Sequence, residues 1–158
     1  MTESHQTGSE QETREVARVM AAALRRGDVV ALYGDLGTGK TQFVKGLCDA
    51  FRVQDTVTSP TFVILNCYSG LENGKKEIFV FHFDLYRVQT AEEIYDLGYE
   101  EFFFGDGISV IEWAERLETL LPSRRYDVTI LFGEGENERR ISIERVGMNL
   151  PGNRTKGI

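Results

Sequence analysis

The sequence of 158 residues contains little of what marks secreted, disulfide-linked or membrane proteins. Its two cysteines, Cys48 and Cys67, have no C-x-x-C spacing, so we expect neither a disulfide framework nor a zinc site. No stretch approaches the run of about 20 apolar residues that crosses a bilayer. The N-terminal residues are polar and acidic, which indicates neither a signal peptide nor a transit peptide. We therefore expect a cytoplasmic protein with no membrane partner.

Positive charge is also scarce. Lysine and arginine number 18 against 25 acidic residues, which gives a formal net charge of -7. Because an acidic chain gains no affinity by neutralising phosphates, tight and independent nucleic-acid binding is disfavoured. The basic pairs at 75–76, 124–125 and 139–140 are more typical of solvated turns or strand ends than of an RNA-binding patch. The chain also lacks the N-K-x-D motif that reads guanine in GTPases.

The length suits one domain with a real hydrophobic core. We expect this domain to span residues 9–146. Residues 1–8 and 147–158 are expected to be loosely ordered, flexible ends.

The first half of the domain alternates between helix and strand signals. A capping box of Ser9 and Glu12 predicts a helix that ends near Gly27. The remaining expected elements are a buried strand at 28–33, a helix at 40–51, and two strands at 61–69 and 76–84 that form a hairpin around Asn73-Gly74.

The second half continues this pattern. A capping box of Thr90 and Glu93 predicts a helix through Leu97 that resumes around 99–104. We then expect a buried strand at 108–113, a helix that stops at Pro122, and a second hairpin formed by 126–132 and 139–146. The sum is an α/β fold of the P-loop NTPase type, a mixed sheet flanked by helices, with antiparallel hairpins added to a parallel nucleus.

The stretch "GDLGTGKT" (34–41) matches the phosphate-binding pattern G-x-x-x-x-G-K-[ST] without a mismatch. A predicted strand precedes it and a predicted helix follows it, which is the context that this motif requires. Its glycines let backbone N–H groups fold around phosphates, and the helix N-terminus adds a favourable dipole. We expect Lys40 to reach the β- and γ-phosphates and Thr41 to give its hydroxyl to Mg²⁺.

Phosphoryl chemistry in this fold needs an acid at the end of a neighbouring buried strand. Glu112 and Asp84 both satisfy this rule, so the rule alone does not decide which of them contacts the metal. The more uniformly apolar run before Glu112 favours Glu112 for the role on the metal side. Strand alternation puts Asp84 on one face with His82, opposite Phe81 and Phe83, which suits an acid that orients water or the metal. His82 is either a neighbour in the site or a hydrogen-bonded core histidine.

Two further features lie near these motifs. The stretch "TSPTF" (58–62) has hydroxyls at Thr58, Ser59 and Thr61 beside Pro60, and its place after the predicted P-loop helix makes it a candidate nucleotide-sensing switch. Trp113 is the single tryptophan. It is either a core residue or an interface anchor at the rim of the site.

Five stretches in order resemble the TsaE family of P-loop ATPases, which act in the synthesis of threonylcarbamoyladenosine in bacterial tRNA. They are "GDLGTGKT", "TSPTF", "HFDLYR" (82–87), "EEIYDLGYEEFF" (92–103) and "VIEWAER" (110–116). The resemblance covers the chain from about Glu12 to Val146. Only the P-loop is diagnostic by itself, but the ordered set is specific. Family members commonly have alanine at the position of Thr38, a small change that a P-loop tolerates.

The resemblance implies a set of site residues. ATP and Mg²⁺ would bind at the P-loop, with Thr41 and Glu112 on the metal side. Asp84 would be the acid important for hydrolysis and a further candidate metal ligand, and Ser59-Pro60-Thr61 would be the nucleotide-sensing segment. The residues expected to contact the nucleotide are Asp35, Leu36, Gly37, Thr38, Gly39, Lys40, Thr41, Gln42 and, on the first helix, Thr13.

The resemblance also implies partners and a role. The family acts with TsaD and TsaB, drives a reset between their catalytic cycles, and meets tRNA only through that complex. We therefore expect an ATPase that is weak alone and stimulated by its partners. Two alternatives stay open. A small-molecule kinase would have to recruit arginines such as Arg116, Arg124 and Arg125 over the phosphates, and a nucleotide-binding regulator that never hydrolyses would not require Asp84.

Overall fold

The structure is a computed structural model that describes residues 2–60 and 64–148. In this part of the chain, seven strands form one sheet in the order β1-β7-β6-β2-β5-β4-β3. The strands are β1 (Thr2–Thr7), β2 (Val29–Tyr33), β3 (Leu65–Glu72), β4 (Lys76–Asp84), β5 (Ile108–Glu112), β6 (Arg125–Phe132) and β7 (Arg139–Val146).

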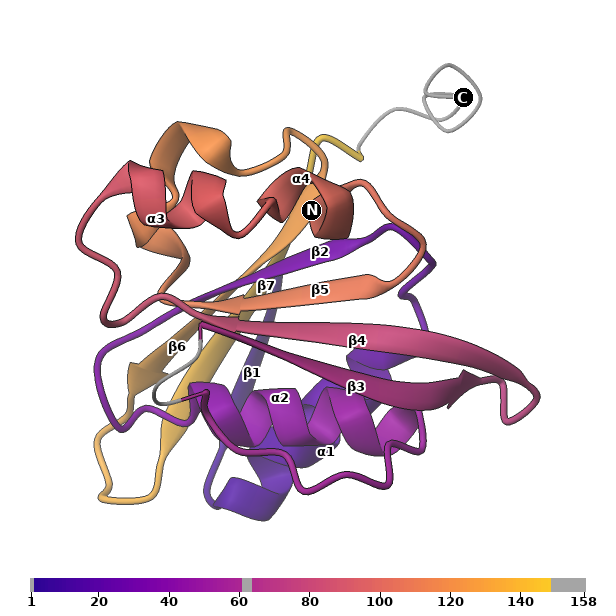
Figure 1. The fold of residues 1–158 in the computed structure, drawn as a ribbon. Coiled ribbons are helices and arrows are strands. Elements are labelled where there is room, and N and C mark those ends of the chain that lie inside the picture. Colours follow the sequence, from indigo (N-terminus) through magenta and orange to yellow (C-terminus); the bar gives the residue numbers. More distant parts are fainter. Residues whose placement is uncertain (1, 61–63, 149–158) are drawn as a thin grey trace.

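Helices cover both faces of the sheet (Figure 1). The helices α1 (Glu10–Ala21) and α2 (Lys40–Ala50) lie on one face, and α3 (Ala91–Asp96) and α4 (Tyr99–Phe103) lie on the other. Two short 3₁₀ helices, η1 (Ala114–Arg116) and η2 (Glu118–Leu120), follow β5. Among the described residues, no helix is long and apolar enough to cross a membrane.

The centre of the sheet is parallel and its sides are antiparallel. Strand β2 pairs in parallel with β5 and β6, and β5 pairs in parallel with β4. The hairpins β3–β4 and β6–β7 are antiparallel and flank this centre. This arrangement confirms the predicted α/β class and the predicted parallel nucleus with added hairpins.

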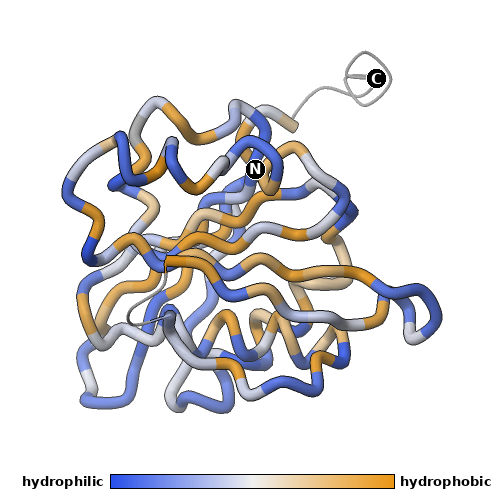
Figure 2. Tube along the Cα trace, viewed as in Figure 1, coloured by the Kyte–Doolittle hydropathy of each residue, from blue (hydrophilic) through white to orange (hydrophobic). Residues whose placement is uncertain are grey.

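Each face of the sheet carries its own hydrophobic core. Residues alternate along β2, so that Val30 and Leu32 face α1 and α2 while Val29 and Ala31 face the other layer. All five residues of β5 are buried as well. The tube in Figure 2 is accordingly hydrophobic along the central strands and more hydrophilic in the connecting turns. Strands buried on both faces read as continuous apolar runs, which is why 28–33 and 108–113 were recognisable in the sequence.

The N-terminal segment differs from the expectation of a flexible end at 1–8. Residues Thr2–Thr7 form the edge strand β1, which pairs antiparallel with β7 along its whole length. Its first five residues are exposed and only Thr7 is buried. The strand is held by main-chain hydrogen bonds to β7, so its polar side chains give no alternating apolar pattern in the sequence.

The segment after β5 also differs from the prediction, which placed one helix before Pro122. The chain forms 3₁₀ turns instead, with the amide of Leu117 bonded to the carbonyl of Ala114 and that of Leu120 to Leu117. Ala114 and Leu117 are buried in the second core, and Leu120 packs against it. A spacing of three residues places all three side chains in one line on a 3₁₀ helix, whereas on an α-helix they would be spread over about 120°.

Helices α1 and α2 approach closely at Gly46. A Cβ atom there would overlap the carbonyl oxygen of Arg14 and lie 2.7 Å from the Cβ atom of Ala17. Only a residue without a side chain fits this crossing. Because α2 begins directly after the P-loop, the crossing with α1 also fixes the position of the end of that loop.

We predict that Gly46→Ala lowers the free energy of unfolding by about 1–3 kcal/mol, since it overpacks the crossing of α1 and α2. The matched control is Asp49→Ala, because Asp49 is exposed on the same helix and its replacement should change stability by less than about 0.5 kcal/mol. Urea unfolding followed by circular dichroism measures both. A Gly46→Ala protein as stable as the control would contradict the close approach.

Candidate functional site

The predicted site residues meet where the parallel strands end. In the sheet register, Glu112 at the end of β5 lies opposite Leu32 of β2 on one side and Asp84 of β4 on the other. The chain leaves β2 into the loop 34–39 and enters α2 at Lys40. The loop and both carboxylates therefore meet at one edge of the sheet.

The loop has the backbone that its glycines permit. Gly34 has a φ of 151° and Gly39 a φ of 109°. A Cβ atom at Gly34 would lie 2.5 Å from the carbonyl oxygen of Ile130 and 2.7 Å from the hydroxyl of Thr38. Gly39 precedes α2 and has no side chain to cap it. The N–H groups of the first turn of α2 are thus available to an anion.

Lys40 is folded back onto its own loop. Its Nζ donates hydrogen bonds to the carbonyl oxygens of Gly34 and Asp35, the latter at 3.0 Å, and lies 3.9 Å from the centroid of the Trp113 ring. Burial lowers the pKa of Lys40, and the negative charge of Glu112 opposes that effect. Phosphate oxygens would replace the two carbonyl oxygens as partners of the Lys40 ammonium and would compensate for the water that it loses on burial.

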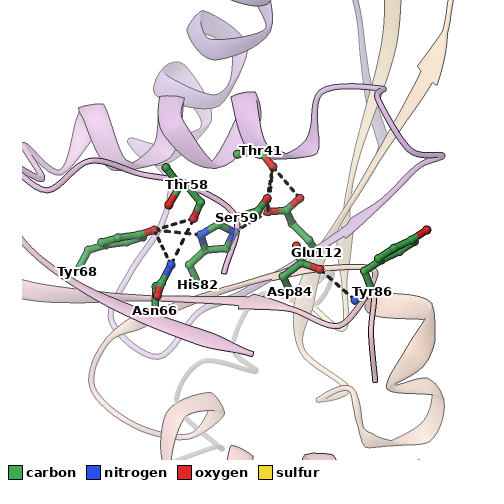
Figure 3. A network of polar contacts seen from close by, with 9 residues as sticks. All are labelled: Thr41, Thr58, Ser59, Asn66, Tyr68, His82, Asp84, Tyr86 and Glu112. Carbon is green, nitrogen blue, oxygen red and sulfur yellow. Dashed lines mark hydrogen bonds and ion pairs between the residues drawn. The ribbon is translucent and has the colours of Figure 1, made fainter. Parts of the chain in front are cut away.

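Thr41 and Glu112 are in direct contact. The hydroxyl of Thr41 lies 3.1 and 3.3 Å from the two carboxylate oxygens of Glu112 and 2.8 Å from the hydroxyl of Ser59 (Figure 3). In residues 2–60 and 64–148, no three side chains of His, Cys, Asp or Glu are grouped to hold a metal by themselves. A Thr hydroxyl with one or two carboxylates fits Mg²⁺, which completes its shell with phosphates and water.

Asp84 occupies a different place from Glu112. Its Oδ1 accepts a hydrogen bond from the amide of Tyr86 at 3.0 Å, and burial raises the pKa of its carboxyl. The structure places Glu112, and not Asp84, beside Thr41. His82 and Asp84 share the strand face that was expected, and the buried Phe83 lies in the opposite core.

A cleft of about 360 Å³ joins these groups. Its lining contains ten residues expected in the site or at its rim, which are Leu36, Gly37, Gly39, Lys40, Thr41, Gln42, Ser59, Asp84, Glu112 and Trp113. Leu36 is exposed, and the side-chain oxygen of Gln42 is buried without a hydrogen-bond partner among the described residues. A buried and unpaired oxygen beside a P-loop is a fit for a polar ligand group.

Two of the expected nucleotide contacts have side chains turned inward. Thr38 is almost fully buried, and its hydroxyl donates to the carbonyl of Asp35 at 2.9 Å. Thr13 is buried too, and its hydroxyl lies 2.9 Å from that of Thr7. A Cβ atom at Gly39 would lie 3.9 Å from the methyl group of Thr13, so Thr13 supports the loop from beneath.

The candidate switch reaches the site through two of its residues. The hydroxyl of Ser59 contacts Thr41, and the carbonyl oxygen of Thr58 accepts hydrogen bonds from Tyr68 and Asn66 at 3.2 and 3.3 Å. Pro60 is buried, and Thr61 lies outside the described residues.

Trp113 has a left-handed backbone, with a φ of 60° and a ψ of 45°. This conformation is strained for a bulky residue, and such strain gathers at functional sites. The ring lies against Lys40 and 5.0 Å from the Tyr86 ring, centroid to centroid. The strained backbone therefore places the indole at the rim of the cleft, over the P-loop lysine.

Arg139 was missed by the sequence reasoning, which treated 139–140 as a solvated strand end. Its Nε donates to the carbonyl of Thr38 at 2.9 Å, and its Nη2 lies 3.4 Å from that of Gly37. Its guanidinium also lies over the Phe132 ring at 4.9 Å. The alternation of buried Ile141 and Ile143 along β7 was the available signal, because it places Arg139 on the same face.

Comparison with known proteins gives a consistent match. The family model for "Threonylcarbamoyl adenosine biosynthesis protein TsaE" matches residues 7–141. The TsaE protein of Bacillus subtilis is 38% identical over 141 residues, which cover 89% of this chain and 84% of that protein. The Treponema pallidum TsaE is 41% identical over 133 residues, covering 82% and 93%. The crystal structure of Bacillus subtilis YdiB superimposes with a TM-score of 0.76 at 33% identity, covering 93% of this chain and 87% of YdiB.

We predict that a magnesium–nucleoside triphosphate changes the intrinsic fluorescence of Trp113. Phosphates would draw Lys40 away from the loop carbonyls and hence from the indole ring, and no other tryptophan contributes to the signal. Titration of the emission measures the effect. Lys40→Ala should shift the starting emission and abolish the response, whereas a response that survives Lys40→Ala would contradict the assignment.

We predict that Arg139→Ala weakens nucleotide affinity by about tenfold, the loss expected for one charged hydrogen bond to the loop. Arg140→Ala removes the same charge from the next, exposed position of β7 and should leave the affinity unchanged. The same fluorescence titration compares both variants. Equal losses would show that net charge matters and that Arg139 does not brace the loop.

Proposed function

The chain belongs to the TsaE family and thus to tRNA threonylcarbamoyladenosine biosynthesis, and from this premise we propose that it is a Mg²⁺-dependent ATPase that couples hydrolysis to a complex of TsaB and TsaD. The observation that carries the proposal is the meeting of Lys40, Thr41, Glu112 and Asp84 in one cleft. These are the parts that phosphoryl transfer requires on a P-loop.

Each residue has a role that follows from its place. The loop amides and the N-terminus of α2 hold the phosphates, and Lys40 moves from the carbonyls of Gly34 and Asp35 to the β- and γ-phosphates. Thr41 and Glu112 hold the metal side. Mg²⁺, when bound, neutralises charge on the phosphates. Asp84 lies half-buried at the end of the adjacent strand, where it accepts a hydrogen bond from the attacking water.

The kinase alternative needs arginines that can reach the phosphates, but the candidate arginines contact other groups. Arg116 donates to the carbonyl of Val88 at 2.9 Å, and Arg125 pairs with Asp127 at 2.8 Å. Arg124 lies near Asp28, before the start of β2 and so at the other end of this strand from the P-loop. We therefore favour an ATPase whose effect is exerted on other proteins.

The surface fits a partner-dependent role. Leu36 and Tyr86 are exposed beside the cleft, at 69% and 47% of their full accessibility. Apolar side chains at the mouth of a nucleotide site suit contact with a protein. The net charge of -7 disfavours direct tRNA binding. We propose that tRNA is met through TsaB and TsaD, in the cytoplasm.

We predict that hydrolysis is slow for the chain alone, on the order of 10⁻³ s⁻¹, and rises when TsaB and TsaD are added. Lys40→Ala should lose nucleotide binding. Asp84→Asn should bind ATP normally but hydrolyse it at least about tenfold more slowly, because the acid that orients water is gone. Nucleotide titration, phosphate release and tRNA modification in the reconstituted system measure the three effects.

Asp49→Asn, an exposed acid at the far end of α2, is the control and should match the unsubstituted chain. Partners that neither bind nor alter hydrolysis would overturn the coupling. If Asp84→Asn left hydrolysis and tRNA modification intact, the role of Asp84 would be wrong. Transfer of phosphate to a metabolite would favour the kinase.

A further inference from the structure

The polar side chains around Glu112 form a closed ring of contacts that returns to the segment at Thr58 and Ser59 (Figure 3). Glu112 lies 2.6 Å from Nε2 of His82, and Nδ1 of His82 lies 3.3 Å from the Tyr68 hydroxyl. That hydroxyl lies 3.2 Å from the carbonyl oxygen of Thr58. The next residue, Ser59, closes the ring through its hydroxyl, 3.5 Å from Glu112.

The ring joins elements far apart in the sequence. Tyr68 comes from β3, His82 from β4 and Glu112 from β5, and these three strands are adjacent in the sheet. All three side chains are at most 4% exposed. In such surroundings polar contacts are strong, and an unpaired group is costly. A change at one member is therefore carried to its neighbours.

The hydrogen count restricts how the ring can be arranged. A carboxylate oxygen only accepts, so Nε2 of His82 carries the hydrogen toward Glu112, and in the neutral ring Nδ1 is an acceptor. The single hydroxyl hydrogen of Tyr68 then has two acceptors, Nδ1 of His82 and the carbonyl of Thr58. The amide of Asn66 donates to both the Tyr68 oxygen and the Thr58 carbonyl, so it supports either choice.

We propose that His82 and Tyr68 are positioning residues that couple the state of Glu112 to the segment at Thr58 and Ser59. His82 orients the carboxylate toward Thr41. When Thr41 and Glu112 engage a metal-bound nucleotide, Ser59 loses partners at its hydroxyl, while Thr58 stays tied to Glu112 through Tyr68 and His82. The segment thereby senses the nucleotide through its main chain. This inference rests on the proposed function of the same site.

The test uses Tyr68→Phe and His82→Gln. The first removes one hydroxyl and keeps the ring, and the second keeps an N–H group for Glu112 but removes the acceptor that faces Tyr68. Both should leave nucleotide affinity without metal unchanged and raise the Mg²⁺ concentration for half-maximal Trp113 response by about tenfold, as loss of an orienting partner does. Without nucleotide, hydrogen exchange in peptides containing Thr58 and Ser59 should be faster in Tyr68→Phe.

Tyr126→Phe is the matched control. Tyr126 is an equally buried tyrosine whose hydroxyl donates to the carbonyl of Ala23 at 3.5 Å, away from the site. It should change neither the Mg²⁺ dependence nor the exchange near Thr58. The double variant Ser59→Ala/Tyr68→Phe should change the Mg²⁺ dependence by less than the sum of the two single changes, because both substitutions break the same ring of contacts.

The outcomes separate the two proposals. An original chain that binds no MgATP would overturn the proposed function. The coupling alone would be overturned if the original chain responds to MgATP and Tyr68→Phe behaves like it, or like Tyr126→Phe, both in Mg²⁺ dependence and in hydrogen exchange. A purely structural role for Tyr68 would lower the unfolding midpoint without the selective change in Mg²⁺ dependence, and would also overturn it.

Discussion

The parallel register of β2, β5 and β4 is the constraint on which the site depends. It sets Glu112 between Leu32 and Asp84, at the edge where the P-loop begins. A slip of β5 by one residue would turn Glu112 to the opposite face. Thr41 would then face no carboxylate and His82 would lose its partner. Both faces of β5 are buried, so a slip would also move every apolar side chain of that strand into the opposite core, where it does not match its neighbours.

The register has an electrostatic cost, because it buries a carboxylate. Glu112 is 3% exposed, and its buried carboxylate accepts hydrogen bonds from Thr41 and His82. Lys40 adds a positive charge nearby, although its own burial lowers its pKa. Such a cluster is retained only if every member has a partner. The strained backbone of Trp113, which holds the indole over Lys40, belongs to the same arrangement.

The features that could be predicted from the sequence are those that depend on local residue patterns. The loop at Gly34–Thr41, the buried strand that ends at Glu112 and the turn at Asn73-Gly74 each depend on neighbours in sequence, and each was recognised. The edge strand β1 was not, because main-chain pairing with β7 leaves no trace in its polar side chains. Arg139 and Tyr68 were missed for a related reason. Their roles arise from contacts with Thr38 and Thr58, which only the sheet order and loop path bring near.

In the structure, the polar side chains at the P-loop bond to groups of the protein itself. Lys40 donates to loop carbonyls, Thr41 bonds to Glu112 and Ser59, and Arg139 holds the carbonyls of Gly37 and Thr38. A nucleotide must replace the first two sets of contacts, so its net gain is the difference between new and old bonds and not their full strength. A protein that binds beside Leu36 and Tyr86 and favours the rearranged loop would lower that cost. The contacts that Lys40 and Thr41 make within the protein are thus a physical reason to expect the partner-dependent turnover that we propose.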